Sequence, residues 1–313
     1  MNVEVLIGKQ ASKGAAATKF FRLKATDYNT NQATNVVQSN ALTGSRFKGN
    51  NTFVSRFNVD GGIPLELTAQ SLLMLLIGAG FTTNGAPVGG VQAYKVTDSV
   101  DNYYTIVMND KKNGAYEQTL DAKISQLDLS LAVDTFITGT ANVIGGTSTY
   151  VTTGAFAGTI EDFSDEQLIC LNATAAKAGT DITAKLSAVT FNLNNNLEAK
   201  YAINSIYCTE IVEGNADLTA TVTYNKFDKT LYSAGFTEMV ANTSSEIRIK
   251  LGTDAAKTSY VELVFPKAVP TSNTAGDWGG QGSLTQNYSL SFDKTAGTVM
   301  SFNTKGVTEP VYV

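Results

Sequence analysis

One stretch of the sequence occurs twice, and this repeat limits the possible folds more than any other feature. The first copy, residues 57–81, reads FNVDGGIPLELTAQSLLMLLIGAGF, and a weaker copy, residues 212–236, reads VEGNADLTATVTYNKFDKTLYSAGF. Both copies end in Ala-Gly-Phe and share a turn, a short alternating strand and a short helical pattern. A chain that contains one supersecondary unit twice is expected to contain two copies of one domain.

The two copies predict where each short helix begins and ends. In the first copy, Thr68 is the expected N-cap, residues 72–77 form an apolar run, and Gly78 suits the C′ position. In the second copy, Asn225 is the expected N-cap and Gly235 is expected to end the helix.

Alternating apolar residues predict strands in both halves of the chain. Asn113-Gly114 is the strongest hairpin signal, and residues 82–100 read as a long loop. Pro266 is expected to end one of the strands. The predicted strands lie within residues 19–25, 46–59, 102–108, 124–133, 135–144, 187–193, 201–212, 246–251, 260–265 and 287–292.

The predicted fold is mainly β with short helices, arranged as two tandem β-sandwich domains that each carry a flanking short α-helix. The 313 residues are enough for two such domains. We expect the division to be an N-terminal arm with little core of its own, a first domain, a linker or insertion, and a second domain. The corresponding ranges are 1–17, 18–144, 145–186 and 187–313.

Composition narrows the classes of function. Charged residues make up only 16% of the chain, so its surface should be uncharged and hydrogen-bonding, which suits repeated packing against other protein. The net charge of −5 gives no general attraction for a polyanion, so a conventional nucleic-acid binder is not expected. The sequence shows neither an apolar run long enough for a membrane span nor a secretory signal at its N-terminus, so we expect a cytoplasmic site of synthesis.

Catalytic chemistry has little support in the sequence. The absence of histidine removes Ser-His-Asp and Cys-His catalysis and His-ligated zinc. Cys170 and Cys208 have no metal-binding spacing and are expected to be reduced, partly buried thiols. We therefore predict no enzyme, no cofactor, and no catalytic, cofactor-binding or metal-binding residues.

Three segments could still hold a site, and each has a plainer interpretation. The acidic cluster Glu161, Asp162, Asp165 and Glu166 lacks the ligand pattern of a calcium loop and is expected to be a solvated loop. Residues 110–114 could attract phosphate but read more simply as a charged hairpin tip. The glycine-rich loop around Trp278 reads as a flexible or interface loop, and a contact with a neighbour or a place in the core remains open for Trp278.

Four segments together resemble the longer kind of phage tail tube protein. They are VLIGKQASKGAAA, GGIPLELTAQSLLMLLIGAGF, LNNNLEAKYAINSIYCTEIVEGNADLTATVTYNKFD and FPKAV, and the resemblance extends over roughly residues 5–294. It implies a β-sandwich with a flanking short helix, a long hairpin that reaches adjacent subunits, and rings that stack into a hollow tube. Residues 124–133 and 287–292 resemble the strands that line the lumen or join subunits in that family.

The resemblance also implies partners. The chain would associate with itself, with a tape-measure protein in the lumen, with terminator and baseplate or tip proteins at the tube ends, and with a sheath if the tail contracts. Rings in this family have six domain positions, so two domains per chain suggest a trimeric, pseudo-hexameric ring, with six chains per ring as the alternative. DNA would pass through without binding, which predicts a neutral to acidic lumen in a virion tail assembled in the host cytoplasm.

Two other classes of function remain as alternatives. A surface-layer, pilus or adhesin subunit would also be rich in β-structure, Thr and Asn, but such subunits are exported and the expected signal is missing. An enzyme or a carbohydrate-binding β-sandwich lacks support because no paired carboxylates or aromatic cluster is evident.

Overall fold

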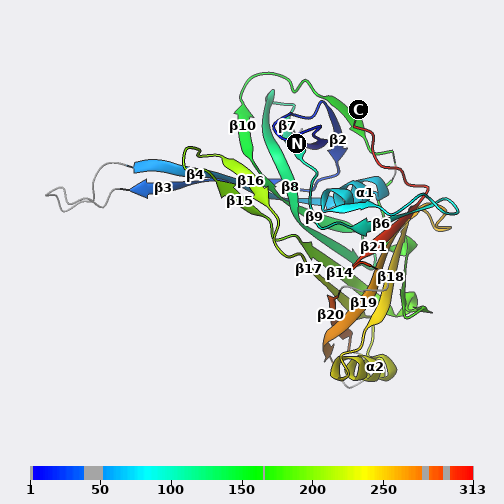
Figure 1. The fold of residues 1–313 in the computed structure, drawn as a ribbon. Helices are drawn as coiled ribbons and strands as arrows, with labels where there is room; N and C mark the ends of the chain where they lie inside the picture. Colours follow the sequence, from blue (N-terminus) through cyan, green and yellow to red (C-terminus); the bar gives the residue numbers. More distant parts are fainter. Residues whose placement is uncertain (1–2, 39–51, 165, 277–281, 292–296, 313) are drawn as a thin grey trace.

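The computed structural model describes residues 3–38, 52–164, 166–276, 282–291 and 297–312. The fold is mainly β, as predicted, with α1 (Ala69–Gly78) and α2 (Lys229–Val240) as the α-helices of the described residues (Figure 1). Two single 3₁₀ turns, η1 (Cys170–Asn172) and η2 (Thr183–Lys185), precede strands. Two long strands, β8 (Ala115–Ala132) and β19 (Tyr260–Ala275), change partners along their length, and each thereby belongs to two sheets.

The first sheet contains the N-terminal strand at its centre. Its neighbours are antiparallel except at one edge, where the last pair is parallel. In spatial order the strands are β10 (Thr147–Val151), the first part of β8 (Ala115–Ala132), β7 (Tyr104–Asp110), β1 (Val3–Lys9), β2 (Lys19–Leu23) and β11 (Thr159–Asp162).

The second sheet runs through both halves of the chain. Its strands are all antiparallel, and the halves meet where β8 pairs with β14 from Ala132↔Ala188 to Gln126↔Asn194. In spatial order they are β3 (Asn29–Gln38), β4 (Thr52–Glu66), β9 (Thr138–Gly145), the second part of β8, β14 (Leu186–Asn194), β17 (Asp217–Tyr224), β20 (Leu284–Leu290) and the second part of β19 (Tyr260–Ala275).

The third sheet packs against the second, and together they form a β-sandwich. Across the interface the rings of Phe191 on β14 and Phe265 on β19 lie 5.4 Å apart. The strands of the third sheet are β13 (Thr180–Asp181), β12 (Ala173–Lys177), β18 (Ser245–Gly252), the first part of β19, β21 (Ser301–Lys305), β6 (Val91–Val96) and β5 (Phe81–Thr83). A separate hairpin consists of β15 (Glu198–Tyr201) and β16 (Cys208–Val212).

The hydrophobic core is not divided between two domains. Buried residues from Val5 to Phe302, including α1 and strands of both halves, form one contiguous cluster. The core thus differs from what two independently packed tandem domains would show, because the sheet pairing of β8 with β14 places the inward side chains of both halves side by side. The domain boundaries at residues 144 and 187 stay a prediction.

Two segments contribute more to the fold than predicted. The expected arm, residues 1–17, contains β1, whose Val5, Leu6 and Ile7 are buried because the strand lies between β2 and β7. The expected linker, residues 145–186, supplies β10 and β11 to the first sheet and β12 and β13 to the third. Short strands at sheet edges have weak periodicity, so their sequence did not reveal them.

Both helices exist, but their predicted ends need correction. Thr68 caps α1 as predicted, through a reciprocal pair of hydrogen bonds with Ser71, whereas Gly78 is the last helical residue and Gly80, at φ 102°, is the left-handed glycine beyond it. In the second half, the N-cap is Asp228 rather than Asn225, and α2 continues through Gly235 to Val240.

Gly235 has a packing role instead of a terminating one. A Cβ at this position would lie 2.2 Å from Nε2 of Gln286 on β20, so glycine lets the helix approach the sheet. The Gln286 amide then donates to the Leu231 carbonyl at 3.2 Å, and the Asn273 amide donates to the Tyr232 carbonyl at 2.7 Å.

Three further strands depart from the predictions. The loop predicted for residues 82–100 contains β6, whose Tyr94 stacks on Phe302 with ring centroids 4.3 Å apart. Strand β19 continues past Pro266, because the pairing with β18 is irregular there and requires no proline amide. The strand expected over residues 201–212 is the β15–β16 hairpin.

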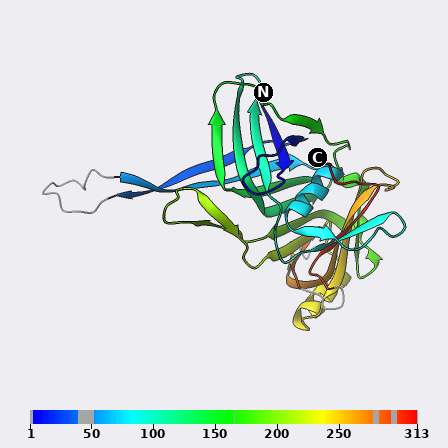
Figure 2. The ribbon, with the colours of Figure 1, turned by 45° about the horizontal axis from the view of Figure 1, so that its top comes forward.

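A long hairpin leaves the body of the molecule. Strands β3 and β4 pair from Asn29↔Gly62 to Gln38↔Thr52, and their outer part projects away from all three sheets (Figures 1 and 2). Strand β3 lies outside the predicted strands, because a strand exposed on both sides has no buried face and hence no alternation.

Candidate functional site

The outward face of the second sheet is the most regular polar surface of the described structure. Strands β8, β14 and β17 alternate between buried apolar and outward polar residues, as in Leu127, Leu129 and Leu131 against Gln126, Asp128 and Ser130. Alternation with period two sends successive side chains to opposite faces of a sheet. One side of these strands therefore builds the core while the other presents hydroxyl and amide groups.

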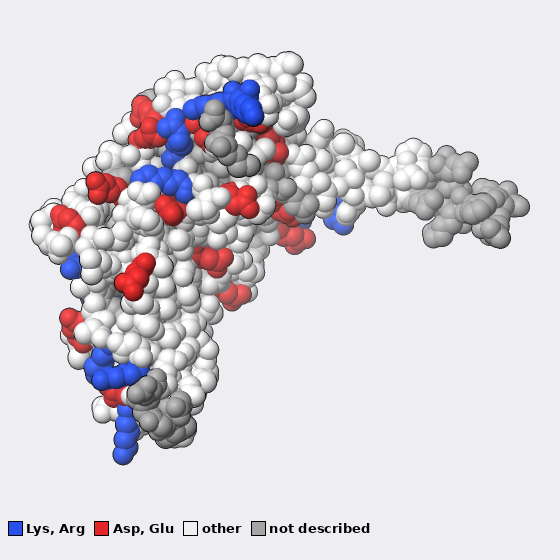
Figure 3. Space-filling view, turned by 180° about the vertical axis from the view of Figure 1, so that it is seen from behind, with Lys and Arg blue, Asp and Glu red and all other residues white. Residues whose placement is uncertain are grey.

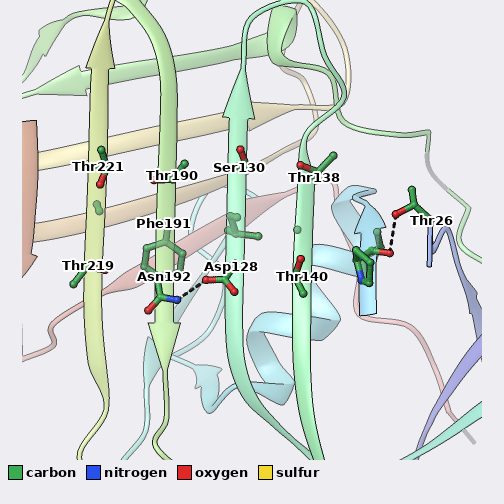
Figure 4. Close-up of a pocket in the computed structure, with 15 residues that line it drawn as sticks. Thr26, Asp128, Ser130, Thr138, Thr140, Thr190, Phe191, Asn192, Thr219 and Thr221 are labelled. Carbon is green, nitrogen blue, oxygen red and sulfur yellow. Dashed lines mark hydrogen bonds between the residues drawn. The ribbon is translucent and has the colours of Figure 1, made fainter. Parts of the chain in front are cut away.

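The strand register aligns these polar residues into rows that cross both halves of the chain. Thr138, Ser130, Thr190, Thr221 and Asn287 are successive partners across β9, β8, β14, β17 and β20. The neighbouring row contains Thr140, Asp128, Asn192, Thr219 and Ser289. In Figure 4 the labelled polar side chains of β9, β8, β14 and β17 lie side by side. These residues line an open hollow of about 390 Å³.

Side chains within the rows hydrogen-bond to one another. The Asp128 carboxylate accepts from the Asn192 amide and, at 2.9 Å, from the Gln126 amide. Further along, the Thr221 hydroxyl donates to the Asn287 amide oxygen at 2.8 Å. Cross-strand polar pairs of this kind stabilise a sheet modestly and leave its surface flat and hydrated.

The exposed charges on the central strands of this face are acidic. Among the described outward residues of β9, the second part of β8, β14, β17 and β20, they are Asp128 and Asp217, while Lys123 on this side is buried and paired with Glu213. On the neighbouring strand β4 the same side carries Asp60 and Glu66 and, in the projecting part of the hairpin, Arg56. We name these outward residues the polar face, and its central strands offer a polyanion hydrogen-bonding groups without an exposed cation.

Two buried polar contacts fasten the halves of the chain beneath the sheets. The Asn195 amide donates at 3.1 Å to the carbonyls of Ala79, which caps α1, and of Ile124. The buried Lys123 ammonium lies 2.8 Å from Glu213 and over the Tyr103 ring. Partial burial acts to raise the pKa of Glu213, but the hydrogen bond and charge of Lys123 outweigh it and lower that pKa.

The acidic cluster predicted to be a solvated loop is divided between a strand and a loop. Glu161 and Asp162 lie in β11, where their exposed carboxylates form ion pairs with Lys19, at 3.0 Å, and with Arg22 on the parallel neighbour β2. Glu166 is exposed in irregular chain, as predicted. Asp165 lies outside the described residues. No group of three or more carboxylate, cysteine or histidine residues in the described part of the chain could hold a metal ion.

The other candidate residues have structural places. The predicted hairpin joins β7 to β8, with Gly114 at φ 61° and the Asp110 carboxylate accepting from the Asn113 amide, while Lys111 pairs with Glu4 at 2.8 Å. Cys170 and Cys208 are free and half-buried, as expected. Trp278 lies outside the described residues.

The negative charge of Glu4, on the first sheet, is neutralised by the cationic side chains beside it. Burial opposes ionisation, yet hydrogen bonds from Lys111, Arg22 and Asn109 lower the pKa of Glu4 below its ordinary value.

In the view of Figure 3, charged residues are scattered and separated by wide uncharged areas. The surface agrees with the low charge content of the sequence.

Sequence reasoning named β8 and β20 as candidate lining strands but missed β9, β14 and β17. The signal was present in VTFNLN and LTATVTY, where Thr and Asn alternate with apolar residues. Alternation alone shows that one face is polar, whereas the rows depend on pairing between distant strands. The register across β8 and β14, which joins the halves, was not accessible from one sequence.

The continuous sheet with its polar face, the projecting hairpin and the low surface charge define a β-rich structural subunit. A family model described as phage tail tube protein matches residues 2–293. The chain belongs to this family, whose members are structural components of the phage tail and hence of the virion. A search of curated proteins found no match. Within the described residues, no helix combines the length and the apolar character that crossing a membrane requires.

Proposed function

We propose that the chain is the repeating subunit of a phage tail tube, in which copies form rings, the rings stack, and the polar face lines the channel through which DNA passes. The observation that supports this most is the polar face itself, which is continuous across both halves and whose exposed charges on the central strands are acidic. Each Lys or Arg that touched DNA phosphate would add affinity through counterion release. A conduit must not bind the DNA that passes through it, and the polar face offers DNA phosphates no exposed Lys or Arg on its central strands.

The arrangement of the halves supports three chains per ring. Because β8 and β14 pair edge to edge, both halves contribute strands to one wall. In the alternative of six chains per ring, the second half would lie outside the wall formed by the first. A trimer fills six positions with two similar halves from each chain, which gives pseudo-sixfold symmetry.

The proposed partners follow from the place of a tube in a tail. Copies of the chain would be the main partner, a tape-measure protein would occupy the lumen before ejection, and terminator and baseplate or tip proteins would bind the two ends. A sheath would surround the tube only in a contractile tail. DNA would be a transient passenger, because the central strands of the polar face present no exposed cation to it.

Electron microscopy of the purified protein tests the proposal. We expect hollow tubes or stacked rings about the width of a phage tail, with class averages that show three chains and pseudo-sixfold density. Particles that remain monomeric at high concentration, or that form flat sheets or solid fibres, would contradict it. Six chains per ring would retain the tube and reject the trimer.

A further inference from the structure

The projecting β3–β4 hairpin carries an apolar block that is exposed among the described residues. Val36 pairs with Val54 and Val37 pairs with Phe53, so the two pairs lie on opposite faces of the ribbon. All four side chains are exposed, with Phe53 at 67%. In Figure 3 the described part of the hairpin is almost free of charged side chains. An exposed block of this kind marks a contact surface.

An apolar groove lies at the open end of the β-sandwich. It has a volume of about 550 Å³ and is lined by the ends of β8 and β14 on one side and by β12 and β18 on the other. Its floor contains the buried side chains of Leu131, Val189 and Ile249, which belong to the core. We name it the end groove.

The rim of the end groove is also apolar and uncovered. Leu171 is 87% exposed, Val133 54% and Phe136 45%, and all three line the groove. Large apolar side chains at a rim that leads to a core-lined floor form a concave site suited to a protruding apolar partner. Asp134 is the one charged side chain that lines this groove.

The two surfaces are complementary and lie at different ends of the molecule. The hairpin projects from one side of the body, whereas β18, which lines the end groove, lies on the other side (Figure 1). The hairpin of one chain therefore cannot fill the groove of the same chain. One surface protrudes and the other is concave, which is the requirement for a heterologous, head-to-tail contact that propagates through identical copies.

Charge and reach agree with this pairing. Arg56 is the one charged residue in the described outer part of the hairpin, residues 32–38 and 52–58, and Asp134 is the one charged residue that lines the groove. Opposite charges at matching surfaces favour one register of docking. Residues 33–38 of β3 lie beyond the part of β4 that pairs with β9, and at about 3.3 Å per residue they carry the apolar block roughly 20 Å out from the body.

We propose that the apolar block of the β3–β4 hairpin of one subunit docks into the end groove of a second copy of this chain. The inference rests on the proposed function and adds the receiving surface. It assigns Val36, Val37, Phe53 and Val54 as the inserted side chains. Val133, Phe136 and Leu171 form the rim that closes on them.

The groove contains a natural thiol that makes the contact directly testable. Cys170 lines the end groove, so a thiol placed on the hairpin by Phe53→Cys, in a Cys208→Ser background, should lie near it in assembled protein. Mild oxidation with copper phenanthroline and oxygen should yield an intermolecular disulfide that peptide mass spectrometry assigns to positions 53 and 170. Lys229→Cys on α2 is the matched exposed control and should not join to Cys170, and Cys170→Ser should abolish the product.

Charge insertion supplies a second, independent measurement. Phe53→Glu and Leu171→Glu change exposed residues, so each monomer should keep the wild-type melting temperature while its assembly falls at least tenfold. Mixing the two variants should restore one contact per pair, because each variant retains the surface that the other lacks. The mixture should then form this contact once for each pair of variants and should not propagate further through it.

The possible results distinguish failure of the docking from failure of the tube function. Tubes that form without the 53–170 disulfide, or a Leu171→Glu variant that assembles normally, would overturn the docking while leaving the tube function standing. A groove in tubes that is occupied by another segment, or by another protein, would overturn it equally. Wild-type protein that forms no assembly would overturn both the docking and the proposed function.

Discussion

Both helices form on the repeated stretch of sequence, yet the structure uses them in opposite ways. Helix α1 ends before Phe81, where the first copy ends, whereas α2 runs past Phe236, where the second copy ends. In α1, nine residues from Ala69 to Gly78 are buried, and the helix lies inside the contiguous core. In α2, Gly235 is the one buried residue, and Phe236 and Val240 are 53% and 70% exposed. A shared sequence pattern therefore determines neither the exact position nor the packing of the helix.

The difference follows from what each helix offers its surroundings. Helix α1 contains no charged residue and is apolar on nearly every side, so burial against the sheets stabilises it. Helix α2 packs only Leu231 and Tyr232 against the core and is also held by polar contacts, among them the Lys177–Glu238 ion pair at 2.8 Å and the amides of Gln286 and Asn273. The first helix is part of the core, whereas the second is fastened to the edge of a sheet.

The largest expected effect is that of a cavity in α1. Leu75→Ala removes a side chain that is 1% exposed and should lower the free energy of unfolding by about 2–5 kcal/mol. Phe236→Ala, on the exposed side of α2, should change that free energy by no more than about 0.5 kcal/mol. Denaturant unfolding of the monomer measures both. Equal losses of unfolding free energy in the two variants would contradict the difference in burial between α1 and α2.

An intermediate effect is expected from the ion pair that fastens α2. Lys177→Met leaves Glu238 partly buried without its partner, and the loss should be about 1–3 kcal/mol, discounted from fully buried pairs because Glu238 retains some exposure. Hydrogen exchange should accelerate in α2 and remain unchanged in α1. The matched control is Lys185→Met, which removes a more exposed pair with Asp228 and should cost about 1 kcal/mol or less. Faster exchange in α1 would show that the helices are not independent.

The smallest expected effect is the pH dependence that the Asp228 cap gives to α2. A hydrogen bond from Lys185, opposed by burial and assisted by the amides of Leu231 and Thr230, lowers the pKa of the Asp228 N-cap. A lowered pKa in the folded state gives stability that is present above the unfolded pKa of about 3.9 and lost as pH falls through the folded value. Protection of α2 should thus decline by about 0.3–1 kcal/mol below pH 4.

The cap of α1 provides the internal reference for that measurement. Thr68 and Ser71 do not titrate, so amide exchange in α1 should show no matching step below pH 4. Asp228→Asn keeps a good N-cap but removes the ionisable group, and should abolish the step in α2. A step that persists in this variant would assign it to another group.

Comparison with the sequence shows which features can be predicted. Capping by Thr68, the hairpin at Asn113-Gly114 and the strands around residues 124–133 depend on local residues and were predicted correctly. The end of α2 was wrong because Gly235 reads as a terminator when its neighbour on β20 is unknown. Strand β3 and the edge strands β10–β13 were missed because exposed or short strands have little periodicity.

The polar face and the end groove also differ in how far the sequence predicts them. The polar face could be anticipated in part, because alternating Thr and Asn along a strand predict one polar side. Its extent depends on the β8–β14 register, a pairing between residues far apart in the chain. The end groove is formed by segments around Val133, Leu171 and Ile249, and no local pattern connects them.

A cryo-electron microscopy reconstruction of the assembled tube at side-chain resolution tests the central claim most directly. The account predicts that Asp128, Asn192 and Thr219 line the lumen, that no exposed Lys or Arg of the central strands accompanies them, and that α2 lies away from the channel. A tube in which the polar face points outward, or in which a basic surface lines the lumen, would contradict it.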